Sequence, residues 1–151
     1  MPVRYRMVSP YASVWTDRRN VMPARGRVEI PERAALARAS GSNWDYIDSY
    51  EIALPPGAPA DPREWTRKIF FGKPFPDHES DEREHVTADA MSVLDFLVSV
   101  LVDDGAVTIT SLVKYRSDWG RRYFAVVRPF HRRLVPWMLA RAAREFARVG
   151  R

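Results

Sequence analysis

Residues 119–151 read WGRRYFAVVRPFHRRLVPWMLARAAREFARVGR, and this is the part of the chain that is most informative about the fold. Within it, residues 123–127 alone could form a strand. Over the longer window, apolar residues recur at spacings of three and four, which is typical of one helical face: Tyr123, Val127, Phe130, Leu134, Met138, Ala142 and Phe146. The stretch therefore predicts a long helix from about Gly120 to Val149, with Phe130 and Met138 in the core.

Two prolines lie inside this predicted helix. Pro129 and Pro136 cannot donate to the carbonyls of Ala125 and Arg132, so we expect a kink or a break near each. A strand followed by a helix that opens at Pro129 is the alternative.

Upstream, the hydrophobic pattern changes to alternation. From Trp44 to Leu54 the residues alternate between two faces, with Tyr46, Asp48 and Tyr50 on the same one, and this period predicts a strand. A short helix is expected over 31–39 and another over 62–71, the second capped by Asp61. Residues 72–84, GKPFPDHESDERE, are polar and predict a loop.

The strongest strand signal follows this loop. Segments 85–88, 91–102 and 106–115 are rich in Val, Leu and other strand formers. Asp104-Gly105 separates the last two, and this dipeptide favours a hairpin turn with positive φ at both positions. At least three antiparallel strands are expected, so the fold class is α+β, an antiparallel sheet packed on a long C-terminal helix.

Composition limits the classes of protein to which the chain can belong. Its 151 residues suit one domain, which we expect over 27–151 behind a basic N-terminal arm, 1–26. Because there is no Cys, disulfides, thiolate metal sites and a cysteine nucleophile are excluded. No apolar run is long enough to span a membrane, and the N-terminus lacks the apolar segment of a signal peptide. We therefore expect a soluble, cytoplasmic protein.

Charge is distributed unevenly along the chain. Residues 1–27 carry six Arg and one Asp, residues 28–119 carry nine basic and seventeen acidic groups, and residues 120–151 carry nine Arg and one Glu. Attraction between the acidic middle and the basic ends within one fold explains this pattern. The alternative is an anionic partner bound by the ends, although the acidic middle disfavours nucleic acid.

Few residues offer chemistry. The three His residues are too far apart in sequence for a helical ligand pair, so no metal site is predicted, and no glycine pattern suits a phosphate or a nucleotide cofactor. His131 lies near the edge of the apolar face of the predicted helix. It is either a partly buried residue bonded within the fold or a ligand-binding or acid–base group. Asp48 and Asp95 lie on predicted strands, where each would pair with a basic group, such as Arg121, Arg122 or Lys114, or act with His131.

The C-terminal motif also resembles a known family. Residues 119–123, WGRRY, and 129–139, PFHRRLVPWML, resemble the string LGR-Y…PFHR-IVP-ML of the bacterial Domain of Unknown Function family 2867. Residues 45–50, 94–96 and 108–113 resemble that family's first strand and central hairpin. This family is grouped with the START-like or Bet v 1-like superfamily, which implies a helix-grip fold. The segment between Phe71 and His85 is shorter than in the family, so a reduced helix grip is expected.

The resemblance implies a ligand site between the sheet and the terminal helix. We expect a small apolar or amphipathic molecule to bind there, although the sequence identifies no reaction. The residues expected at the site are Tyr123, Val127, Phe130, His131, Leu134, Asp48 and Asp95. A non-enzymatic module that binds nucleic acid, a membrane surface or an acidic protein through the basic ends is the alternative.

Overall fold

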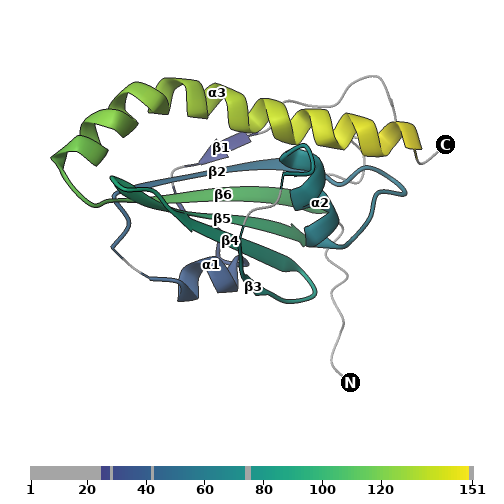
Figure 1. Cartoon of the computed structure of the whole chain (residues 1–151). Helices are drawn as coiled ribbons and strands as arrows, with labels where there is room; N and C mark the ends of the chain where they lie inside the picture. Colours follow the sequence, from purple (N-terminus) through teal and green to yellow (C-terminus); the bar gives the residue numbers. More distant parts are fainter. Residues whose placement is uncertain (1–24, 28, 42, 74–75, 150–151) are drawn as a thin grey trace.

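One antiparallel sheet separates a long helix from a short one in the computed structural model, which describes residues 25–27, 29–41, 43–73 and 76–149 (Figure 1). The six strands have the order β1-β2-β6-β5-β4-β3, and all neighbours are antiparallel. The strands are β1 (Arg25–Arg27), β2 (Tyr46–Ala53), β3 (Asp77–Ser80), β4 (Glu84–Ala90), β5 (Leu94–Asp103) and β6 (Ala106–Tyr115). The α+β class predicted from the sequence is confirmed.

The central hairpin also follows the prediction. Asp104 and Gly105 have φ angles of 53° and 73°, so both turn positions are left-handed. This geometry matches the twist of the two ten-residue strands that the turn connects.

The two edge strands were not predicted. β3 lies inside the segment predicted as a loop, and β1 begins within the predicted N-terminal arm. β3 has the sequence DHES and is mostly exposed, so it has no apolar face to mark it as a strand. Its backbone pairing with β4 holds it in place. The remainder of the predicted arm, 1–24, lies outside the described residues.

Within the described ranges, three helices accompany the sheet: α1 (Ala35–Ala39), α2 (Pro62–Ile69) and α3 (Asp118–Val149). The predicted cap of α2 is present, since the Asp61 side chain accepts a hydrogen bond from the Arg63 amide at 2.9 Å. α1 is shorter than the helix predicted over 31–39. At the start of α3, the Ser117 hydroxyl accepts from the Gly120 amide at 3.3 Å, which satisfies one of the unpaired amides of the first turn.

α3 is one continuous helix despite its two prolines, and it bends as it crosses the sheet (Figure 1). The strand-then-helix alternative is therefore wrong. Pro136 has no N–H for the carbonyl of Arg132, and the Tyr50 hydroxyl of β2 donates to that carbonyl instead, at 3.3 Å. Ala125, the residue that loses its partner at Pro129, is exposed, where water can bind its carbonyl.

The apolar face of α3 that packs on the sheet differs from the predicted one. The core of this layer includes Val135, Met138 and Leu139 of α3, with Trp65 of α2. Met138 is buried as predicted, but the prediction for Phe130 is wrong, because its side chain is 71% exposed. Apolar residues occupy more than one side of α3, so periodicity alone could not select the side that meets the sheet.

The opposite face of the sheet carries α1 and a smaller apolar cluster that includes Ala37, Leu97 and Leu112. Glu84 of β4 is buried there, and its carboxylate accepts hydrogen bonds from the amides of Leu36 and Ala37 at 2.7 and 3.0 Å and from the Ser99 hydroxyl at 2.6 Å. These three donors compensate the buried charge.

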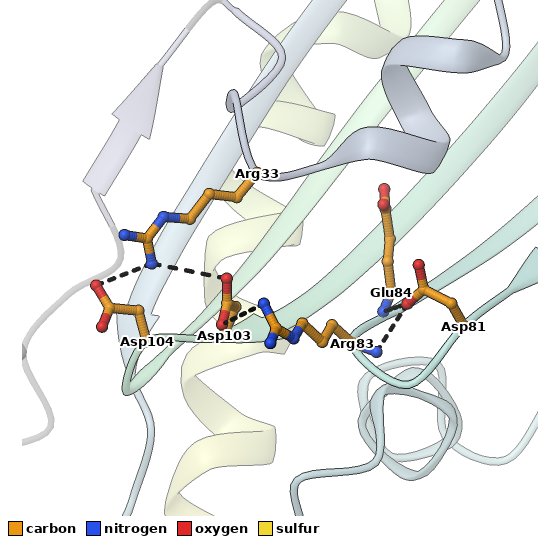
Figure 2. A network of polar contacts seen from close by, with 6 residues as sticks. All are labelled: Arg33, Asp81, Arg83, Glu84, Asp103 and Asp104. Atoms are coloured by element: carbon orange, nitrogen blue, oxygen red, sulfur yellow. Dashed lines mark hydrogen bonds and ion pairs between the residues drawn. The ribbon is translucent and has the colours of Figure 1, made fainter. Parts of the chain in front are cut away.

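Charged side chains gather around the β5–β6 turn, next to the segment that precedes α1. Figure 2 shows Arg33 reaching from the segment before α1 to the β5–β6 turn, where it pairs with Asp104 at 2.9 Å and Asp103 at 3.6 Å. Arg83 joins Asp103 from the β3–β4 turn at 3.7 Å. In that turn the Asp81 carboxylate accepts from two backbone amides. These contacts thus connect the segment before α1, the β3–β4 turn and the β5–β6 turn with one another.

Candidate functional site

A cavity of about 250 Å³ lies between the first half of α3 and the sheet. β5 and β6 form its floor, α3 forms its wall, and Phe70 and Met91 also contribute. Its remaining lining residues are Leu94, Phe96, Leu97, Val98, Ile109, Ser111, Val113, Tyr123, Phe124, Val127, His131, Leu134, Val135 and Met138. This is the location predicted from the resemblance, between the sheet and the terminal helix.

The cavity exists because the two helices on this face do not cover the whole sheet. α2 ends at Ile69 and covers one end of β5, near Val100 and Val102. At the other end, Gly120 brings the first turn of α3 against the backbone of Val93, and a Cβ on this glycine would lie 2.0 Å from the Val93 carbonyl oxygen. The stretch of β5 between these two contacts faces the cavity.

The cavity opens to the surface along one side. Met91, Tyr123 and Leu134 belong to its lining and are 40%, 46% and 51% exposed. Phe124 and Leu94, by contrast, are buried. A molecule could therefore enter past the partly exposed side chains.

Most lining side chains are hydrocarbon, and two of the polar ones, Ser111 and His131, lie beside Asp48. Ser111 lies on β6, and Asp48 of β2 is its cross-strand partner. His131 reaches this place from α3, with its Nε2 3.3 Å from Asp48 Oδ2. His131 therefore lies between the cavity and the buried Asp48, and the 3.3 Å contact between them does not have the geometry of a hydrogen bond.

Two tyrosines complete the environment of the buried Asp48. The Tyr46 hydroxyl donates to Asp48 Oδ2 at 2.6 Å, and the Tyr50 hydroxyl lies 3.5 Å from the same oxygen. Burial, together with the hydrogen bond to Asp48, raises the pKa of Tyr46 to about 12. Tyr46 therefore stays protonated and donates to the carboxylate over the whole physiological range.

Two buried polar atoms of this group, Asp48 Oδ1 and His131 Nε2, have no hydrogen-bond partner among the described residues. An unsatisfied buried acceptor is costly, and such atoms often mark sites that a water or a ligand completes.

The structure brings together five of the seven predicted site residues. Tyr123, Val127, His131 and Leu134 line the cavity, and Asp48 contacts His131. Phe130 is outside the lining and points away from the core, as its exposure shows.

Asp95 is the other exception. It lies between Leu94 and Phe96, both of which line the cavity, so strand alternation turns its side chain to the opposite face of the sheet. There it pairs with Arg116 at 2.8 Å, rather than with Arg121, Arg122 or Lys114.

Several residues of the site were not predicted from the sequence. Tyr46 and Tyr50 share a strand face with Asp48, and this alternation was visible in the sequence. The cavity floor, Phe96, Val98 and Ser111, required the sheet order, which no local pattern specifies. Phe124 was overlooked because the predicted apolar face of α3, which includes Phe130, is rotated away from the face that packs on the sheet.

The basic end of α3 is partly engaged within the fold. Arg141 contacts Glu145 at 2.6 Å, donates to the Lys68 carbonyl and stacks on Phe71 with its guanidinium 3.8 Å from the ring centre. This part of the charge pattern follows the intramolecular explanation.

Other polar clusters offer less chemistry. His85 lies against Asp77 and the Ser80 hydroxyl, and burial lowers its pKa. Among the described residues, no group of three or more acidic or His side chains could hold a metal ion. No helix in the described ranges combines the length and apolar character needed to cross a bilayer.

Comparison with known protein families supports the resemblance seen in the C-terminal motif over part of the chain. Residues 73–138 match a family described as "Protein of unknown function (DUF2867)". The matched region contains β3 to β6 and the part of α3 that lines the cavity, but not β2 with Asp48. No curated protein and no solved structure matches the chain.

Proposed function

We propose that the protein binds a small, largely apolar molecule with one polar group in the cavity between α3 and the sheet. The observation that carries this proposal is an open, mostly hydrocarbon-lined cavity in which two polar side chains, Ser111 and His131, both neighbour Asp48. Ligand sites in proteins typically combine apolar walls with a few polar groups that fix orientation. The resemblance to a START-like helix grip supports the same site.

Cavity size limits the ligand. A dry apolar cavity of about 150 Å³ accepts benzene, so the 250 Å³ found here suits a bicyclic aromatic or a comparably short aliphatic molecule. A hydroxyl or amine on that molecule could hydrogen-bond to His131 or Ser111. The proposal includes no reaction.

The test uses 1-naphthol, which has a suitable size and one hydroxyl, and naphthalene, which lacks it. Fluorescence titration should show saturable binding of both molecules, with 1-naphthol bound more tightly. Val127→Phe should abolish binding because residue 127 lines the cavity. Val126→Phe is the matched control, since Val126 is 70% exposed and lies outside the lining.

A second variant tests the polar group. His131→Leu should remove the preference for 1-naphthol while keeping the binding of naphthalene. Equal loss of binding in both phenylalanine variants, or no saturable binding to the parent chain, would contradict the proposed function.

A further inference from the structure

A continuous row of large apolar side chains lies exposed along α3. We name it the α3 apolar stripe, and its members are Trp119, Tyr123, Val126, Phe130, Leu134 and Trp137. They are separated by four, three, four, four and three residues, so they share one side of the helix. Each is between 46% and 71% exposed.

The stripe is too long to be a few scattered surface residues. From 119 to 137 it extends about 27 Å at 1.5 Å per residue. Exposed apolar patches of this extent usually mark interaction sites. Tyr123 and Leu134 also line the cavity, so the stripe is continuous with the cavity opening.

Charge restricts what can cover the stripe. Residues 119–140 contain five arginines and no acidic residue. Arg122 and Arg133 border the stripe, and neither forms an ion pair with a described residue. A second copy packed antiparallel would bring Arg122 of one chain near Arg133 of the other, which disfavours self-association. The partner should therefore be anionic as well as apolar.

We propose that α3 docks on an anionic membrane surface through this stripe. Trp and Tyr prefer the boundary between headgroups and acyl chains, and Trp119, Tyr123 and Trp137 are spread over the whole stripe. Arginines beside an apolar helix face are typical of helices that lie in that boundary without crossing it. Docking in this way would direct the cavity opening toward lipid, although binding to the surface does not depend on any ligand in the cavity.

The test is flotation of the full chain with vesicles of phosphatidylcholine alone and of phosphatidylcholine with phosphatidylglycerol in a 3:1 ratio. We expect binding to the mixed vesicles only. Replacing Val126 and Phe130 by Gln should weaken the binding at least about tenfold, since both apolar side chains lose their lipid contact. Replacing Arg122 and Arg133 by Gln should weaken it about thirtyfold, because each arginine near an anionic surface contributes about five- to sixfold.

Matched controls change the same residue types elsewhere. Val149→Gln alters an exposed valine outside the stripe, and Arg83→Gln removes an arginine from the β3–β4 turn; both should leave flotation within about twofold of the parent. Circular dichroism of every variant establishes that it is folded.

Three results would overturn the proposal. One is a folded parent chain that fails to float with anionic vesicles. Another is flotation that the stripe variants leave unchanged. The third is a dimer in sedimentation equilibrium that the Val126 and Phe130 changes convert to a monomer, since the stripe would then be covered by a second copy. The Val127→Phe variant separates this surface from the cavity, because it should lose 1-naphthol and keep vesicle binding.

Discussion

Tyr50→Phe should reveal how the fold tolerates a proline in the middle of α3. In the parent chain the Tyr50 hydroxyl donates to the Arg132 carbonyl, the group that Pro136 cannot reach with an amide. Removing the hydroxyl leaves that part-buried carbonyl without a donor. An unsatisfied polar group of this kind costs about 1 to 3 kcal/mol. For a domain of this size, a cost of 2 kcal/mol lowers the melting temperature by about 4 to 8 °C.

A double-mutant cycle isolates this hydrogen bond. Pro136→Ala supplies an N–H for the Arg132 carbonyl, so Tyr50→Phe should cost much less in that background. The loss of the weaker Tyr50 contact with Asp48, 3.5 Å, is common to both backgrounds and cancels. The assay is urea unfolding of the four proteins, followed by circular dichroism. Costs of Tyr50→Phe that agree within about 0.5 kcal/mol in the two backgrounds would show that the Tyr50 hydroxyl does not compensate for Pro136, since independent sites are additive to that precision.

Three further changes test other parts of the fold. Gly120→Ala should lower the unfolding free energy by at least about 2 kcal/mol, since its Cβ would collide with the Val93 carbonyl. Urea unfolding measures this loss, and the exposed Ala125→Gly variant of the same helix serves as the comparison. Glu84→Gln should cost about 1 to 3 kcal/mol, because the amide removes a charged acceptor from two α1 amides; amide hydrogen exchange should show the loss concentrated in residues 34–39, and uniform exchange would contradict it. Burial lowers the pKa of His85 below its ordinary 6.5, so the folded state binds a proton less readily than the unfolded chain does. The unfolding free energy should therefore be highest above pH 6.5 and decrease as the pH falls below that value. His85→Gln should reduce the loss of unfolding free energy below pH 6.5. The same loss in this variant as in the parent chain would exclude His85 as its source.

The elements that were predicted correctly are those whose own residues carry both the hydrophobic period and the signals that begin or end the element. β2, β6, the Asp104-Gly105 turn and α2 each combine the right period with the right end residues. Four of the cavity residues on α3 were predicted for a similar reason, because the family motif lies on that helix: Tyr123, Val127, His131 and Leu134. β3 was overlooked because its stability comes from pairing with β4 rather than from its own side chains.

The orientation of α3 could not be obtained from periodicity. Phe130 and Met138 both fit a spacing of three and four, yet only Met138 meets the sheet. The contact between Gly120 and Val93, far apart in sequence, fixes the start of the helix, and the Tyr50 bond holds its middle. Both are long-range contacts, which a local pattern does not contain.

The short outer strands have a consequence for behaviour at high concentration. An exposed sheet edge presents unpaired amides and carbonyls that can recruit a strand from another molecule. β3 has only four residues, carries Asp77 and Glu79, and changes register between them. β1, at the other edge, has three residues. The Val- and Leu-rich strands β5 and β6 therefore lie in the interior of the sheet, where their backbone groups are paired and cannot begin edge-to-edge aggregation.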